Sequence, residues 1–203
     1  MFRWWFGPKD GLLRHVGHHP AFRVPPASEH DLVPPDSDET LLSCYMNQIS
    51  STFPFVIIPP DTAVEELQST RPFLLNVIKM IASVRHWRSV HGQSYAVMQH
   101  ISEAVLIRSE RSLELLQGIL CFLGYYHSHC LMHSQFNNLI QLSISMIADL
   151  GLNQSPVARE RTRILVTNPP EVRSRTNEER RAIVGVWYMS SKYVDLLYPI
   201  TRT

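Results

Sequence analysis

The sequence predicts an all-α protein. In several segments apolar residues recur every three or four positions, the spacing that places them on one face of an α-helix. Alternating apolar and polar runs joined by hairpin turns, which would indicate a β-sheet, do not occur in the 203 residues. Only 8 residues are glycine, so the turn residues that many short strands need are scarce. We therefore expect an irregular multi-helix bundle of about six to seven helices.

The composition allows a real core and argues against nucleic-acid binding. Hydrophobic residues make up 44% of the chain and charged residues 18%, so general disorder is not expected. The formal net charge is +1, which gives no broad positive field to attract phosphates. Arginines gather in residues 159–181, but glutamates interrupt that run and indicate a solvated surface of mixed charge. We expect no DNA-binding residues in this chain.

The cysteine count and the N-terminal sequence indicate the compartment. Three cysteines, Cys44, Cys121 and Cys130, form no disulfide framework, and an odd number suits a reducing environment. The opening "MFRWWFGPKD" has too short an apolar patch for a secretory signal. No apolar run approaches the roughly 20 residues that cross a bilayer. We expect an intracellular, soluble protein without a membrane partner.

The first 36 residues are expected to differ from the rest. Residues 1–36 show no helical or strand period and contain two Pro-Pro pairs, so we expect a disordered or loosely docked arm. Residues 37–203 are expected to form the helical domain. Its first helix is capped by Asp36 or Ser37, with acidic residues in the first turn and an apolar stripe that begins at Leu41.

The stretch "FPFVIIPP", residues 53–60, interrupts the helical pattern. Its prolines lack the N–H groups that a central strand donates, so a strand is disfavoured. We expect an extended, proline-flanked connector that lays Phe53, Phe55 and Ile57 against the core, with Ile58 as a further contact.

Two helices and an amphipathic segment should follow the connector. Thr62 and Glu65 have capping-box spacing for a short helix, and Arg71-Pro72 begins the next one. The second helix should bury one face, formed by Phe73, Val77, Met80, Ile81 and Val84. Residues 93–108 should bury Tyr95, Met98, Ile101, Val105 and either Ile107 or Arg108.

The segment 111–127 is apolar on most sides, which predicts a central, buried helix. Gly118 and Gly124 each cost up to ~1 kcal/mol in a helix relative to alanine, which favours close approach of neighbouring helices at both positions. Residues 135–150 should form a further helix, at whose end we expect Gly151 in the left-handed conformation and Leu152 packed back on the helix.

A polar loop over residues 152–175 leads to the last helix. Thr176 and Glu179 have the spacing of a second capping box. The face that this helix buries should consist of Ile183, Val186, Trp187 and Ser190.

Residues able to bind metal concentrate in "HSHCLMH", which contains His127, His129, Cys130 and His133. His129 and His133 are four residues apart and could share an ion on one helix face. The favoured alternative is that these imidazoles lie at the negative end of a buried helix and interact with its dipole. Because no Cys-x-x-Cys or acidic partner is nearby, we expect no bound metal.

Catalytic motifs are not found in this sequence. It contains no G-x-S-x-G elbow, phosphate-binding loop or dinucleotide fingerprint. The paired carboxylates at 65–66 and 178–179 stand where the helix dipole favours acidic residues, and buried cysteines usually pack as small hydrophobes. We therefore expect no catalytic or cofactor-binding residues and no enzymatic activity.

Several segments together resemble one known family. The run "FPFVIIPP", the helix start "RPFL", "LLQGILCFLGYYH", "ADLGLN" and "EERRAIVGVWY" are similar in order and spacing to the middle regulatory region of fungal zinc-cluster transcription factors. The resemblance extends from about Leu41 to Ser191. It implies a helical domain that regulates transcription by RNA polymerase II in the nucleus and does not itself read DNA.

The sequence also departs from this family. Three widely spaced cysteines cannot form the six-cysteine zinc cluster, so no zinc cofactor is expected in this chain. The family domain normally continues beyond "WYMSS", which leads us to expect a fragment that is truncated at its C-terminus and exposes apolar surface.

The sequence leads to three hypotheses about function. The first is a regulatory fragment that acts through protein partners, a second copy of itself or a small-molecule effector. The alternative is a stand-alone helical protein with an apolar ligand pocket among the helices of residues 111–150. The third is a small metalloenzyme centred on His129 and His133.

Overall fold

The described part of the chain is built from α-helices. The structure, a computed structural model, describes residues 36–83, 86–125, 135–154 and 174–197. Within these ranges there are seven α-helices and no strand, which confirms the predicted all-α fold. The helices are α1 (Asp38–Cys44), α2 (Val64–Thr70), α3 (Pro72–Ala82), α4 (Trp87–Ile101), α5 (Leu113–Gly124), α6 (Phe136–Asp149) and α8 (Asn177–Leu197).

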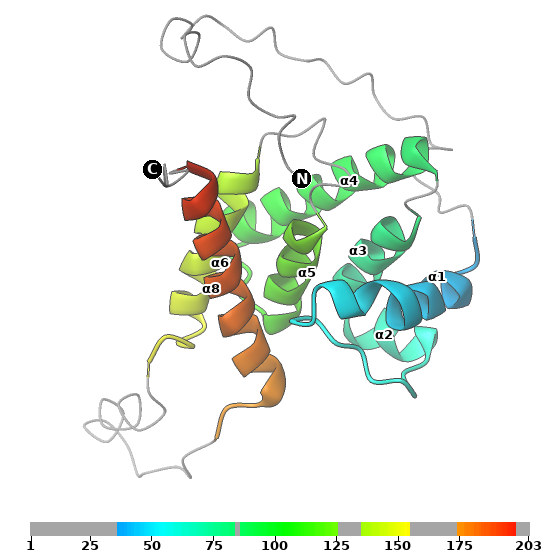
Figure 1. The fold of residues 1–203 in the computed structure, drawn as a ribbon, viewed down its shortest axis with the longest axis horizontal. Coiled ribbons are helices and arrows are strands. Elements are labelled where there is room, and N and C mark those ends of the chain that lie inside the picture. Colours follow the sequence, from blue (N-terminus) through cyan, green and yellow to red (C-terminus); the bar gives the residue numbers. More distant parts are fainter. Residues whose placement is uncertain (1–35, 84–85, 126–134, 155–173, 198–203) are drawn as a thin grey trace, which may run out of the picture.

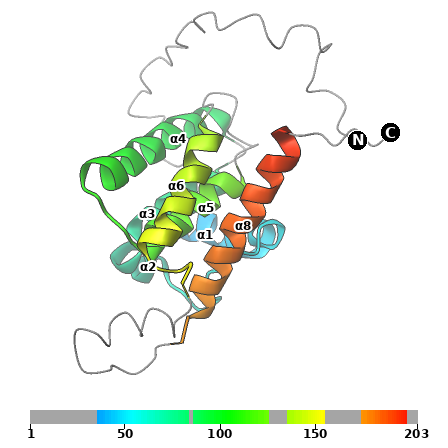
Figure 2. The ribbon, with the colours of Figure 1, turned by 90° about the vertical axis from the view of Figure 1, so that its left-hand side faces the viewer.

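Helix α5 lies at the centre of the bundle. It contacts α3 on one side and both α6 and α8 on another, and α6 and α8 also contact each other (Figures 1 and 2). Every residue from Leu115 to Leu123 is buried, as expected for a helix that is apolar on most sides. Helix α3 is packed in turn by α1, α2 and α4.

Shorter turns extend two of the helices. A π-helical turn, η3 (Tyr45–Ile49), and a 3-10 turn, η4 (Ser50–Thr52), continue α1 towards the connector. A second π-helical turn, η5 (Ser102–Ile107), continues α4. None of the helices in the described ranges combines the length and apolar character required to cross a bilayer.

Most of the predicted helix ends are confirmed. The Ser37 side chain accepts the Thr40 N–H at the start of α1. At the start of α8 the Thr176 N–H donates to Glu179 (2.8 Å) and the Glu179 N–H donates to Thr176 Oγ1 (3.2 Å), which completes the capping box. Gly151 has a φ of 66°, and the Leu152 N–H donates to the Ile147 carbonyl at 2.9 Å, closing α6 as predicted.

The predicted capping box of α2 is wrong. The helix begins at Val64 with Ala63 as its N-cap, and no side chain caps it. Thr62 belongs to the preceding turn, where its N–H donates to the Pro59 carbonyl at 3.1 Å. That turn moves the helix start one residue beyond the position that capping by Thr62 requires.

The connector at 53–60 is non-helical, as expected, but it does not run straight. The chain turns at Pro54 and Phe55. The turn changes which side chains point inward, so Val56 is buried and Ile57 is 42% exposed. Phe53 and Ile58 are buried as predicted, and Phe55 is half-buried. The predicted burial of Ile57 is therefore wrong.

Other residues assigned to the core are also exposed. Tyr95 is 53% and Trp187 69% exposed. Of the two alternatives at the end of residues 93–108, Ile107 is 76% exposed and Arg108 is exposed as well. Helix α8 instead buries the small residues Ala182 and Gly185, beside Val186 and Met189. Small residues allow close approach to the neighbouring chain, since a Cβ at Gly185 would lie 2.9 Å from the Phe55 Cβ. This packing rotates Trp187 away from the core.

Helix α3 is buried more completely than predicted. Its buried residues include the predicted Phe73, Val77, Met80 and Ile81. Val84 lies outside the described residues. Close approach at both glycines of α5 is confirmed, but only at Gly118 is the neighbour a helix, α3, whereas at Gly124 it is Phe53 of the connector. A Cβ at Gly118 would lie 2.6 Å from Phe73 Cδ1, and one at Gly124 would lie 2.6 Å from the Phe53 ring.

Candidate functional site

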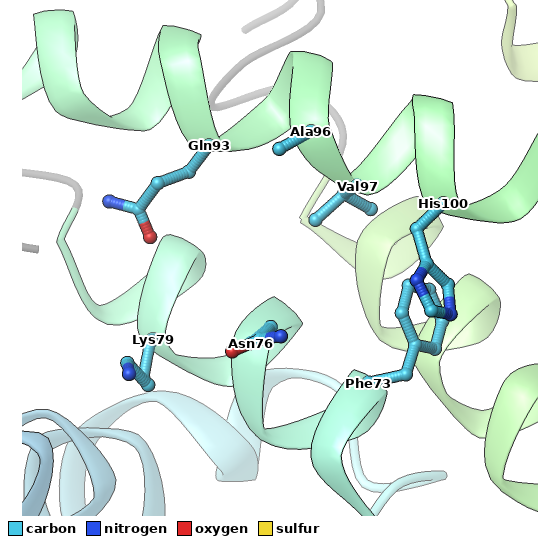
Figure 3. Close-up of a pocket in the computed structure, with 7 residues that line it drawn as sticks. All are labelled: Phe73, Asn76, Lys79, Gln93, Ala96, Val97 and His100. Atoms are coloured by element: carbon cyan, nitrogen blue, oxygen red, sulfur yellow. The ribbon is translucent and has the colours of Figure 1, made fainter. Parts of the chain in front are cut away.

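A cavity of about 340 Å³ lies between α3 and α4 (Figure 3). Its residues come from one face of each helix, at spacings of three and four positions, so two regular helices suffice to build it. The lining residues are Phe73, Asn76 and Lys79 from α3 and Gln93, Ala96, Val97 and His100 from α4.

Gln93 is the buried polar group of the α4 wall. Its side chain is 7% exposed, and its Nε2 donates to Ser89 Oγ at 2.7 Å, one helical turn earlier. Figure 3 shows the amide oxygen turned towards α3. The Gln93 amide oxygen is therefore a hydrogen-bond acceptor at the cavity wall, and the hydrogen bond to Ser89 orients it.

An aromatic pair forms one end of the cavity. The rings of Phe73 and His100 are stacked, with centroids 4.6 Å apart and planes at 11° (Figure 3). The Phe73 ring also lies against Gly118 of α5. Because α5 holds one side of this ring and His100 covers its face, the aromatic end is part of the packed core and does not have to be ordered by a ligand.

The ammonium group on the α3 wall is already paired. Lys79 Nζ lies 2.8 Å from both carboxylate oxygens of Asp38 in α1. The Lys79 side chain is mostly buried, which reduces solvent screening of the pair. The cavity is thus polar, but the one Lys or Arg among its lining residues is compensated.

The start of α3 is fixed from α5. Glu114 Oε1 accepts the Phe73 N–H at 2.8 Å, and it lies at the positive end of the α3 dipole. Arg71, the residue before α3, pairs with Glu178 of α8 at 3.0 Å. These contacts hold α3 in place while α4 forms the opposite wall.

Cys121 of α5 belongs to a buried hydrogen-bonded cluster with Tyr45. The Cys121 thiol donates to the Tyr45 hydroxyl (3.5 Å), which donates to the Val56 carbonyl (2.9 Å). Burial raises the pKa of the Cys121 thiol to about 12 and raises the pKa values of the Tyr45 and Tyr125 hydroxyls. A thiol held neutral in this way packs as a hydrophobe and is a poor nucleophile.

The metal-site candidates His129 and His133, with His127 and Cys130, lie outside the described residues, so that expectation stays a prediction. In the ranges that the structure does describe, no three His, Cys, Asp or Glu side chains gather as a metal site would require. Of the paired carboxylates, Glu178 forms the ion pair with Arg71 and Glu179 closes the capping box.

Sequence reasoning missed Asn76, Gln93 and His100 as site residues. One signal was present: Gln93 and Ser94 occupy the buried stripe of α4 between Val90 and Val97, where apolar residues are expected. The pocket expected among residues 111–150 does not coincide with this cavity. In that region α5 packs on α3, α6 and α8, and residues 126–134 lie outside the described residues, so the expected pocket stays a prediction.

Comparison with known proteins gives the chain distant relatives. No family model matches it, and no solved structure matches it. Transcription factor himD of Aspergillus japonicus is 29% identical over 180 residues, which cover 86% of this chain. Transcription factor opdL of Penicillium oxalicum is 27% identical over 173 residues, or 79% of this chain. The chain spans about 30% of the length of each relative. Its distant homologues are thus fungal transcription factors.

Proposed function

We propose that this helical bundle is a regulatory, non-enzymatic module of a fungal zinc-cluster transcription factor, acting in the nucleus in control of RNA polymerase II transcription. The observation that carries the proposal is the alignment with two fungal transcription factors over 86% and 79% of the chain. The order of the family-like segments between Leu41 and Ser191 supports the zinc-cluster assignment, with the zinc cluster itself outside this chain.

The charge distribution supports a module that does not read DNA. Binding to duplex DNA depends on Lys and Arg side chains that neutralise phosphates. Here the chain has a formal net charge of +1. In the described residues four basic side chains are paired with carboxylates: Arg71 with Glu178, Lys79 with Asp38, Arg108 with Glu110, and Arg111 with Asp149. Regulation then proceeds through a protein partner, a second copy of the chain or a small effector.

A tethering assay tests this function. The full chain is fused to an unrelated DNA-binding domain in a fungal cell, upstream of a reporter gene. We expect the fusion to change reporter transcription several-fold relative to the DNA-binding domain alone. Leu116→Asp, which places a charge at a fully buried position of α5, should abolish the change. Equal transcription with and without the fused chain, at matched nuclear protein levels, would contradict the proposal.

The domain boundary proposed here is residue 37, with residues 1–36 as a separate arm. Ser37 caps the first helix, so a chain that begins at residue 37 keeps all described packing. Removal of residues 1–36 should leave the reporter response of the tethered module unchanged. A loss of the response would show that the arm belongs to the regulatory unit.

A second candidate is a stand-alone small-molecule-binding protein. The observation that favours it is the cavity between α3 and α4, which lies outside the helices of residues 111–150 where the sequence predicts a pocket. A ligand that raises the melting temperature in a chain without any reporter effect would favour this candidate over regulation.

A further inference from the structure

We propose that the α3–α4 cavity binds a small, neutral organic molecule that donates a hydrogen bond to Gln93 and packs an apolar part beside the Phe73–His100 pair. The cavity volume of about 340 Å³ falls within the range of small-molecule sites, roughly 300–1,000 Å³. The role of this molecule as an effector rests on the proposed function, whereas its binding does not.

The hydrogen-bond donor on the ligand follows from Gln93. The amide nitrogen donates one of its two hydrogens to Ser89, and the oxygen faces the cavity. The oxygen lines the cavity, so a ligand N–H or O–H that reaches it can form a hydrogen bond there in place of water. Asn76, on the opposite helix, supplies a second amide with both donor and acceptor atoms.

The apolar part of the ligand follows from the remaining walls. Val97 and Phe73 are buried residues whose apolar surface lines the cavity, and Ala96 adds a methyl group beside them. The Phe73 ring is supported on both sides, since it lies against Gly118 and is stacked on His100. A rigid apolar wall costs a ligand little ordering free energy.

The ion pair between Lys79 and Asp38 indicates that the ligand is uncharged. An anion would have to compete with Asp38 for Lys79, whose Nζ already contacts both carboxylate oxygens. A cation would find no carboxylate among the lining residues. Burying either charge without a partner is unfavourable, so both ions should bind more weakly than a neutral molecule of the same shape.

Three probes of nearly identical shape test the charge: benzamide (neutral), benzoate (anionic) and benzamidinium (cationic). Each is titrated into the full, isotope-labelled chain while NMR follows the side-chain amides of Gln93 and Asn76. We expect benzamide to shift both signals saturably and the two ions to bind at least about tenfold more weakly. Absence of any shift with benzamide, or equal affinity for benzoate, would overturn the proposal.

Two variants place the binding in the cavity. Ala96→Trp fills it from an exposed position and should abolish the benzamide shifts, whereas the matched change Ala148→Trp, on an exposed position of α6, should leave them intact. Gln93→Met keeps the shape, removes the acceptor and should weaken benzamide binding about tenfold. Wild-type affinity in either cavity variant would overturn the proposal, and the Gln93→Met titration decides the matter if Ala96→Trp does not fold.

The binding assay tests the site and the tethering assay tests the regulatory function, so either proposal can be refuted without the other. Binding of benzamide without any reporter response to the tethered chain refutes the regulatory function and leaves the site. A reporter response in the Ala96→Trp variant equal to that of the wild-type chain, with no benzamide shift in the wild-type protein, refutes the site and leaves the regulatory function.

Discussion

The two faces of α3 differ in how they are packed. Towards α5 the helix is closed, because Gly118 has no side chain and the Phe73 ring occupies the space that a Cβ would need. Towards α4 the same helix is open, because Gln93 and His100 present polar groups that line a cavity. Phe73 belongs to both faces, with an edge against Gly118 and its ring plane stacked on His100. The glycine of α5 therefore allows close packing on one face of α3, whereas the polar side chains of α4 line a cavity on the other face.

Removing the shared ring should have the largest effect. Phe73→Ala deletes a side chain that is 5% exposed, and we expect it to lower the free energy of unfolding by about 3–5 kcal/mol. Urea denaturation followed by circular dichroism measures the loss. Tyr95→Ala, on the exposed side of α4, is the matched control and should change stability by no more than about 0.5 kcal/mol. Similar losses in both variants would contradict the assigned burial of Phe73.

Adding a methyl group to the closed face should have the next largest effect. Gly118→Ala places a Cβ against the Phe73 ring and should destabilise the fold by about 1–3 kcal/mol, although alanine favours helices. In a Phe73→Ala background the clash is gone, so Gly118→Ala should instead stabilise by up to about 1 kcal/mol. The same sign of the effect in both backgrounds would rule out the close approach as its cause.

The buried cluster of Cys121 and Tyr45 should respond to loss of a single hydroxyl group. Tyr45→Phe leaves the buried Val56 carbonyl without its donor, and we expect a loss of about 1–2 kcal/mol in thermal or urea unfolding. Tyr95→Phe removes a hydroxyl from an exposed tyrosine and should change nothing measurable. Equal stability of both variants would show that the Tyr45 hydrogen bond does not stabilise the fold.

Alkaline pH should weaken the same cluster. Burial raises the pKa of Cys121 from 9.0 to about 12, so the unfolded chain loses this proton at lower pH than the folded chain. The contribution of the protonated Cys121 thiol to the free energy of unfolding is fully present below pH 9.0. It is lost as pH rises towards about 12, by at most about 1.4 kcal/mol per pH unit. Urea unfolding at neutral pH and at about pH 10 should show a smaller loss in Cys121→Ala than in Cys44→Ala. Identical pH dependence in the two variants would contradict the assignment to Cys121.

Features that depend on residues close together in the sequence were predictable. Ser37, the pair Thr176 and Glu179, and Gly151 each act within one helical turn, so their sequence spacing was sufficient to locate helix ends. The burial of α5 also followed from its composition, since a helix that is apolar on most sides has no face to offer to water. Thr62 failed as a cap because the Pro59 turn delays α2, which spacing does not reveal.

The orientation of each helix and the existence of the cavity depended on the tertiary structure. Trp187 and Tyr95 lie near the edges of apolar stripes, and only the position of the neighbouring elements decided that they face solvent. The carboxylate that caps α3 comes from Glu114, some forty residues later in the chain. The sequence by itself determined that the protein is helical and where most helices begin, because those choices are local. Which polar residues meet across α3 and α4 was decided only by the angle and register at which these two consecutive helices pack, because the spacing within each helix does not fix how it is placed against the other.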